Sequence, residues 1–216
     1  GLLWQRRDFV RSSAEDHPKL GSEHKNGDDV RMKAMVGMMV ILFSTLAVQA
    51  QTGWQQKVIE ELPLMGHRNW IVIVDSAYPL QSSAGVETVE TGADQLVVLD
   101  DVLNAIRQSR HVRALAHLDA ELPFVPESEA PGVDRYREQL KSRLSGIPTD
   151  SSLHQNLIDH LNETGKTFHV LILKTTMTIP YTSVFLQLDC KYWSAESEAK
   201  IRARMKASGP GTNSTH

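Results

Sequence analysis

The sequence has almost no cysteine, few aromatic residues and little net charge. Cys190 is the only cysteine among 216 residues, so no disulfide can form within the chain. Aromatic residues make up 6% of the sequence, the formal net charge is −3, and no basic stripe with interleaved aromatic side chains occurs. Because protein surfaces that bind nucleic acid carry such stripes, the composition argues against a nucleic-acid partner.

Several motifs of catalysis and cofactor binding are also missing. The nine histidines include no His-x-x-x-His pair, and no cysteine pair has the spacing of a zinc site. The sequence has no Gly-x-Ser-x-Gly elbow for a serine nucleophile. It also has no glycine-rich phosphate loop after a strand pattern. We therefore predict no metal and no cofactor.

The first part of the chain divides into two segments of different character. Residues 1–31 are polar and charged without apolar periodicity, which predicts a segment that is disordered or lies upstream of the true start. Residues 32–50 follow Arg31, include Lys33, continue as an apolar run over 34–48 and end in Val48-Gln49-Ala50. A basic flank, a short apolar run and small residues at a cleavage site are typical of a secretory signal peptide.

The apolar run predicts export rather than membrane anchoring. It has about fifteen residues, whereas a membrane span needs about twenty. A buried core helix is the alternative, but that interpretation leaves the basic flank unexplained. We expect a periplasmic or secreted protein that begins near Gln51 and has no stable membrane anchor after cleavage.

Residues 51–206 have the length and pattern of one α/β domain, and residues 207–216 read as a flexible Gly/Ser/Thr tail. Apolar strand patterns at 70–75, 112–118, 169–174 and 183–189 alternate with helical patterns, among them 55–64, 132–144 and 153–168. Asp100 or Asp101 is expected to cap a further helix that runs to Ser109. The alternation predicts a layered α/β/α fold with a central, mostly parallel or mixed sheet.

The strand pattern at 70–74 is flanked by two groups that can carry chemistry. The run Trp-Ile-Val-Ile-Val is apolar throughout, which predicts a strand buried on both faces. His67 precedes it and Asp75 follows it. Polar residues at the carboxyl ends of central strands commonly bind ligands, although Asp75 as a simple turn cap is the alternative.

Two separated segments carry a family resemblance. Residues 62–79 contain Met-Gly-His, the apolar strand and Asp-Ser-Ala-Tyr-Pro, and residues 172–186 contain Ile-Leu-Lys-Thr and Ile-Pro-Tyr-Thr-Ser-Val-Phe-Leu. In this order and at this distance, the segments resemble the D-ribose pyranase / L-fucose mutarotase (RbsD/FucU) family. The resemblance covers about 55–193, weakly in the middle. It would make the chain an exported variant of that family.

The resemblance implies a cofactor-free sugar isomerase. Exchange between anomers or ring forms needs a proton removed from a hydroxyl and one delivered to the ring oxygen, and imidazole titrates near the required pH. The resemblance assigns catalysis to one residue, His67. It assigns the binding of a ribose- or fucose-like monosaccharide to five residues: Asp75, His160, Tyr181, Thr182 and Ser183.

Two departures from the family pattern and two ambiguous matches leave alternatives open. Asn69 stands where the family has a carboxylate, and Ser183 stands where it has asparagine. The family's second histidine matches His160, with His154 as a looser candidate. Residues 75–79 lean toward the fucose branch and 179–181 toward the ribose branch, so the sugar is not chosen. A non-catalytic exported sugar-binding or scaffold protein of the same fold is the alternative function.

The spacing of His67 and Asp75 also predicts assembly. A strand rises about 3.3 Å per residue, so the two side chains should lie about 16 Å or more apart. That is too far for both to hold one monosaccharide. We therefore predict a cyclic homo-oligomer in which His67 of one subunit faces Asp75 and Tyr181 of its neighbour, as the resemblance also implies.

Overall fold

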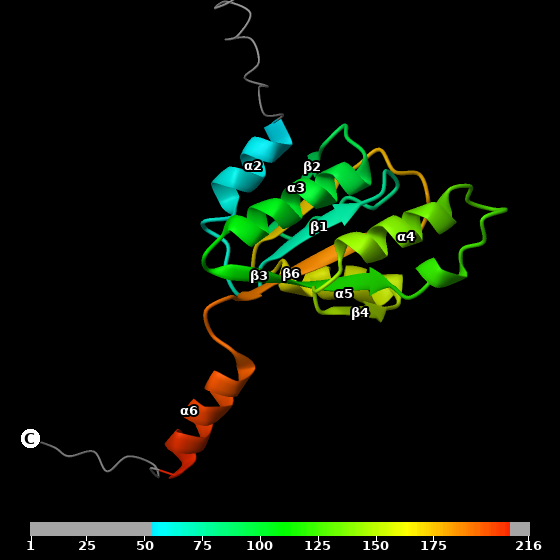
Figure 1. The fold of residues 1–216 in the computed structure, drawn as a ribbon. Coiled ribbons are helices and arrows are strands. Elements are labelled where there is room, and N and C mark those ends of the chain that lie inside the picture. The colour runs from blue at the N-terminus through cyan, green and yellow to red at the C-terminus, as the bar shows by residue number, and fades with distance from the viewer. Residues whose placement is uncertain (1–52, 208–216) are drawn as a thin grey trace, which may run out of the picture. The chain divides into compact units, whose positions relative to one another are not determined.

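The computed structural model describes residues 53–207, so the predictions for residues 1–31, the signal peptide at 32–50 and the tail from 208 lie outside it. Within this range, six strands form one mixed sheet in the order β2-β5-β1-β6-β3-β4 (Figure 1). The strands are β1 Trp70–Val74, β2 Val86–Glu90, β3 Val112–Asp119, β4 Thr149–Ser152, β5 Val170–Lys174 and β6 Val184–Cys190. The helices are α2 Gly53–Glu61, α3 Gln95–Gln108, α4 Val133–Arg143, α5 His154–Thr164 and α6 Ala195–Ala207, with a short 3₁₀ turn at Leu122–Phe124.

Strand β1 lies at the centre of the sheet. It pairs parallel with β5 and antiparallel with β6, and β6 pairs antiparallel with β3. All five residues of β1 are buried, which explains its continuous apolar run. The predicted mixed sheet is confirmed.

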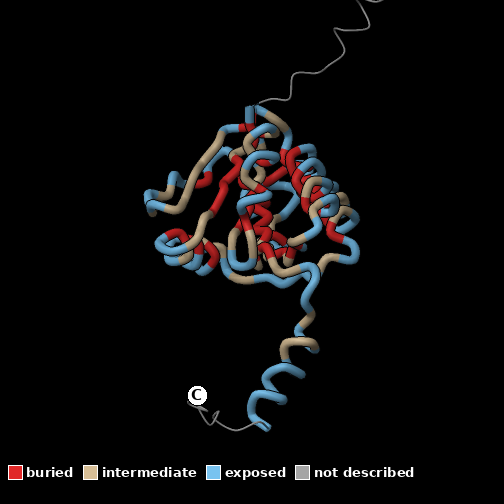
Figure 2. The backbone as a smooth tube through the Cα atoms, turned by 90° about the vertical axis from the view of Figure 1, so that its left-hand side faces the viewer, coloured by how far each residue is buried: buried red, intermediate tan, exposed pale blue. Residues whose placement is uncertain are grey.

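Helices cover both faces of this sheet. Ile71 and Ile73 belong to one core cluster with the apolar residues of α2, α3 and α4. Trp70, Val72 and Val74 belong to a second cluster, with Leu157 and Leu161 of α5. Alternate residues of a strand point to opposite faces, so β1 serves both clusters. The predicted α/β/α layering is confirmed, and Figure 2 shows the buried strands between exposed helical surfaces.

Two strands and one helix start differ from the sequence-based predictions. β2 and β4 were not predicted because their sequences, VETVE and TDSS, are too polar to give an apolar strand signal. The prediction that Asp100 or Asp101 caps a helix is wrong. α3 begins at Gln95, and Asp94 accepts hydrogen bonds from the amides of Leu96 and Val97. The apolar piece after Asp94 is therefore the buried side of the first helical turns.

The strand directions define two functional edges. β1, β3 and β5 run the same way, so Asp75, Asp119 and Thr175 meet at one edge, which we call the carboxyl edge. The antiparallel β6 enters at this edge and ends at the other, beside the start of β1. His67 and Asp75 therefore belong to opposite edges of the sheet.

The last helix differs from the others in its burial. α6 contains no buried residue (Figure 2). Two side chains of the preceding segment contact its first turns: the Trp193 indole donates to Glu198 at 3.1 Å, and the Ser194 hydroxyl lies 3.2 Å from that of Ser197. No helix within 53–207 is both long and apolar enough to cross a membrane.

Candidate active site

A cavity of about 480 Å³ opens at the carboxyl edge of the sheet. Residues of the turn after β1, the first residue of α5 and the loop before β6 line it: Asp75, Ser76, Ala77, Tyr78, Pro79, His154, Thr178, Pro180 and Tyr181. The predicted residues Asp75 and Tyr181 are thus brought together, and His154 joins them.

Asp75 both shapes this cavity and faces it. Its Oδ1 accepts a hydrogen bond from the amide of Ala77 at 2.8 Å, which holds the turn that follows β1. No donor within residues 53–207 contacts its second oxygen, Oδ2. The turn-cap and ligand-binding interpretations of this residue are therefore compatible, because the two oxygens are used separately.

His154 is held by a buried carboxylate behind it. Its Nδ1 lies 2.9 Å from Oδ1 of Asp119, the last residue of β3, which is 1% exposed. The carboxylate of Glu121 accepts a hydrogen bond from the backbone amide of His154, which fixes the start of α5. A proton on Nδ1 directed at Asp119 leaves Nε2 as the nitrogen that can exchange a proton with a ligand.

The pKa values of this pair follow from the same contact. The hydrogen bond to Asp119 raises the pKa of His154 above its ordinary value, against the opposing effect of burial. Burial raises the pKa of Asp119, although the contact with His154 opposes that shift. A histidine whose protonated form is favoured in a partly buried site is suited to delivering a proton.

Two tyrosine rings pack edge-on against His154. The ring centroids of Tyr181 and Tyr78 lie 5.6 Å and 6.1 Å from that of His154. Tyr181 is exposed, and its φ of 60° places the backbone in the left-handed region, which is costly for a non-glycine residue. Such strained residues gather at functional sites, and this one presents a phenol beside the imidazole.

Polar atoms behind the cavity have no partner among the described residues. They are the Tyr78 hydroxyl, Oδ2 of Asp119 and the Ser183 hydroxyl, all buried. Asp119 and Ser183 lie one position beyond the last register pair of β3 and β6, Leu118 and Val184, so they are neighbours at this edge. Buried polar groups in proteins are normally hydrogen-bonded, so this group is suited to a polar ligand or to water.

The remaining predicted binding residues lie elsewhere. His160 is on α5, but its ring packs against Trp70 with centroids 5.4 Å apart, outside the cavity. Thr182 is buried, and its hydroxyl donates to the carbonyl of Ile179. The Tyr136 hydroxyl and the Gln95 amide both donate to the Thr182 carbonyl, which anchors the loop that carries Tyr181.

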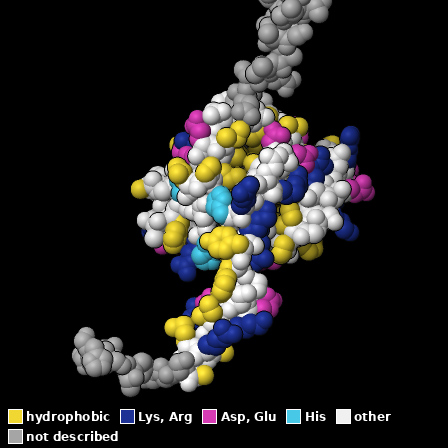
Figure 3. Space-filling view, turned by 60° about the vertical axis from the view of Figure 1, so that its left-hand side comes forward, with side chains coloured by type: hydrophobic (Ala, Val, Ile, Leu, Met, Phe, Trp, Pro, Cys, Tyr) yellow, Lys and Arg dark blue, Asp and Glu magenta, His cyan; other side chains and the backbone are white. Residues whose placement is uncertain are grey.

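His67 lies at the opposite edge in a separate cavity of about 470 Å³. Arg113, Asp189, Trp193 and Glu198 are among the residues that line this second cavity, and it shares no lining residue with the first. On the face drawn in Figure 3, histidine side chains lie among basic and hydrophobic ones near the segment that leads to α6. Within one chain, His67 and Asp75 therefore lie in different cavities. This is the separation that the sequence spacing predicts.

Sequence reasoning missed Asp119 and gave His154 a secondary place. The signal for Asp119 was present, because it follows the strand pattern at 112–118 just as Asp75 follows the pattern at 70–74. His154 could not be preferred over His160 from spacing alone, because the two are six positions apart on one helix and point in different directions.

One cluster within residues 53–207 has the composition of a metal site. Ligand atoms of Glu61, Glu87 and His169 lie within 4.8 Å of one another. The Lys57 ammonium lies 2.8 Å from Glu61 and 2.7 Å from Glu87, where it neutralises both carboxylates. The contacts therefore describe an ion-pair network, and the cluster lies outside both cavities.

Comparisons with known proteins find similar structures only. No family model and no curated protein sequence matches the chain. Bacillus subtilis RbsD complexed with D-ribose is 16% identical with a TM-score of 0.43, over 64% of this chain and 93% of that one. Bifidobacterium longum FucU is 20% identical with a TM-score of 0.43, over 62% and 94% of the two chains. The fucose mutarotase of Streptococcus pneumoniae in complex with L-fucose is 20% identical with a TM-score of 0.40, over 61% and 89%.

The solved structures bear the names of the two kinds of protein that the sequence motifs resemble. The bound sugars are properties of those proteins. The candidate active site therefore stands on its own contacts.

A first prediction concerns the buried carboxylate. Asp119→Asn should lower the pKa of His154, because it removes the charged acceptor that favours the protonated ring. The measurement is an NMR titration of the His154 ring protons. Asp150→Asn is the matched control, since Asp150 pairs with His117 and not with His154. An unchanged His154 pKa in Asp119→Asn would show that the contact does not govern its protonation.

Proposed function

We propose that the protein is a sugar mutarotase or pyranase-like isomerase, which interconverts anomers or ring forms of a monosaccharide by general acid-base catalysis. The observation that carries the proposal is His154, which contacts the buried Asp119 and lines one cavity with Asp75 and Tyr181. The reaction requires one group that removes a hydroxyl proton and one that protonates the ring oxygen. Within this cavity, His154 supplies an imidazole suited to delivering a proton, and Asp75 supplies an oxygen, uncommitted among the described residues, that can accept hydrogen bonds from the sugar.

The chemistry of the cavity walls suits a small polyol. Asp75 can accept hydrogen bonds from sugar hydroxyls, and Nε2 of His154 can exchange a proton with one. The exposed ring of Tyr181 can pack against the apolar face of a sugar while its hydroxyl forms a hydrogen bond. The sequence resemblance supports a ribose- or fucose-like substrate without choosing between them.

The proposal includes assembly into a cyclic homo-oligomer. His67, the acid-base residue that the resemblance assigns, lies at the other edge of the sheet from Asp75 and is exposed within its own chain. A head-to-tail contact brings one surface patch of a subunit to a different patch of the next, and such contacts form a ring when the rotation between subunits closes. We infer that His67 completes the cavity of a neighbouring subunit.

Exchange NMR on candidate sugars tests the proposal. The protein should accelerate exchange between the anomer resonances of D-ribose or L-fucose above the buffer rate. His154→Gln should reduce this acceleration, since it removes the imidazole from the cavity, whereas His160→Gln should change it little because that ring packs on Trp70. Binding detected by saturation transfer without faster exchange would instead support a non-catalytic sugar-binding protein. Asn69 and Ser183, which differ from the family pattern, are the reason to consider this second function.

A further inference from the structure

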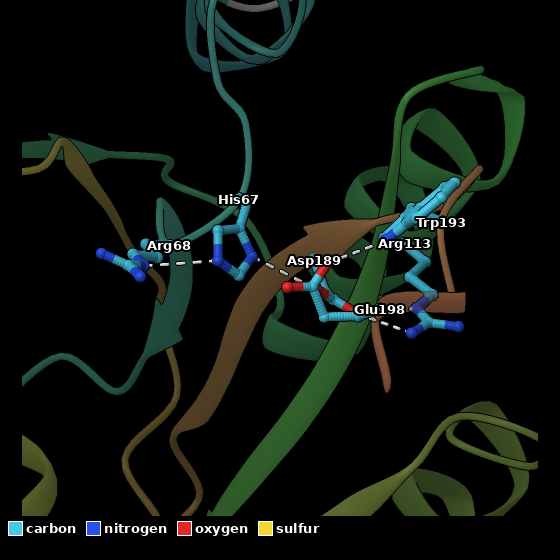
Figure 4. A network of polar contacts seen from close by, with 6 residues as sticks. All are labelled: His67, Arg68, Arg113, Asp189, Trp193 and Glu198. Carbon is cyan, nitrogen blue, oxygen red and sulfur yellow. Dashed lines mark hydrogen bonds and ion pairs between the residues drawn. The ribbon is translucent and has the colours of Figure 1, made fainter. Parts of the chain in front are cut away.

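The tautomer of His67 is determined by its two neighbours. Arg68 Nε lies 3.3 Å from Nε2 of His67, and Nδ1 lies 3.2 Å from Oδ1 of Asp189 (Figure 4). An arginine side chain can only donate hydrogen bonds, so Nε2 must accept. In the neutral ring the proton is then on Nδ1, where the Asp189 carboxylate accepts it.

Asp189 is itself held in place from the far side. Arg113 donates to its Oδ2 from Nε at 2.9 Å and from Nη2 at 2.6 Å, which leaves Oδ1 for His67 (Figure 4). Burial would raise the pKa of the Asp189 carboxyl, but hydrogen bonds from Arg113, the Cys190 backbone and His67 outweigh burial and lower it. Asp189 is therefore a charged acceptor at neutral pH.

No nearer side chain takes this role. Asn69 lies two residues after His67, and its Oδ1 accepts a hydrogen bond from the amide of Gly66 at 2.7 Å. Its Nδ2 donates to the carbonyl of His169 at 3.2 Å. Both ends of this amide hold the turn before β1, so the carboxylate that orients the ring comes from β6.

We propose that Asp189 is a positioning residue for His67, which fixes the Nδ1–H tautomer and leaves the Nε2 lone pair to act as the base. This inference rests on the proposed function, because the proton transfer is that of a sugar site on the neighbouring subunit. A carboxylate partner fixes both the tautomer and the orientation of an imidazole, so the basic nitrogen stays directed at the substrate. A ring without that partner exchanges tautomers and rotates, and its basic nitrogen is in place only part of the time. Arg68 contacts that nitrogen in the isolated chain and must give way to the sugar.

The test combines kinetics with a direct readout of the ring. In the full chain, Asp189→Ala should lower kcat for sugar exchange by about 10- to 100-fold with KM nearly unchanged, the usual cost of losing an imidazole-orienting partner. Asp189→Glu should restore part of the rate, because it keeps the carboxylate. Arg68 also contacts the ring, so the tautomer is read by long-range ¹H–¹⁵N NMR in chains that carry Arg68→Ala, at a pH where the ring is neutral. The chain that keeps Asp189 should show the Nδ1–H tautomer, and the chain with Asp189→Ala should show a mixture of tautomers. The His67 signals are identified by their loss in His67→Gln.

The matched control is Asp100→Asn, which breaks a comparable exposed ion pair with Arg143 and should change neither kcat nor the His67 signals. An unchanged kcat in Asp189→Ala would overturn the proposal, as would the same tautomer population with and without Asp189 in the Arg68→Ala chains. The two proposals fail differently. A wild-type protein that does not accelerate exchange refutes the enzyme, while the nitrogen shifts of the Arg68→Ala chains still decide whether Asp189 sets the tautomer.

Discussion

Replacing His67 with alanine should lower the rate of catalysed sugar exchange by about 10²- to 10⁴-fold, the usual contribution of a positioned acid-base group. Sugar affinity should change much less, because the binding groups Asp75 and Tyr181 lie in the other cavity of the chain. The rate is measured by exchange NMR, and the affinity by saturation transfer on the same samples.

Asp75→Asn provides the contrasting variant. It keeps the size of the side chain but replaces the charged acceptor, so the loss should fall mainly on binding. The hydrogen bond to the amide of Ala77 can persist in this variant, because asparagine retains one carbonyl oxygen. Unchanged catalysed exchange in both variants would show that the roles assigned to these positions are wrong.

Mixing two inactive variants should restore activity. His67→Ala supplies an intact Asp75, and Asp75→Ala supplies an intact His67, and the structure places the two groups in separate cavities. After dissociation and random reassembly of a ring, about one quarter of the shared sites should contain both wild-type side chains, each from a different subunit. The recovered activity should therefore approach about one quarter of that of wild-type protein treated in the same way.

The controls for this experiment are the two variants dissociated and reassembled separately, which should stay inactive. Recovery only after mixing would support sites shared between subunits. Full activity of a strictly monomeric wild-type protein at micromolar concentration would refute them, as would a mixture that remains inactive after wild-type rings reassemble successfully. Sedimentation or light scattering under the assay conditions gives the oligomeric state.

Parts of the site were accessible from sequence because they depend on local order. Asp75 and Tyr181 were predicted from short motifs, and the structure places both on one cavity. The separation of His67 from Asp75 also followed from local geometry, since an extended strand has a nearly constant rise. Asn69 illustrates the limit of such reasoning, because the carboxylate beside His67 comes from Asp189, 122 positions away.

By itself, the sequence determined the central strand, the alternation of strands and helices, and the groups at each end of β1, because apolar periodicity and strand geometry act over a few residues. Only the tertiary structure decided the partners of the two histidines. Asp119 at the end of β3 reaches His154 at the start of α5, and Asp189 of β6 reaches His67 because β6 pairs with β1. Tertiary contacts also made edge strands of the polar segments β2 and β4 and placed His154 rather than His160 in the cavity. The physical reason is that strand register and helix orientation are fixed by packing between distant segments, which no local pattern records.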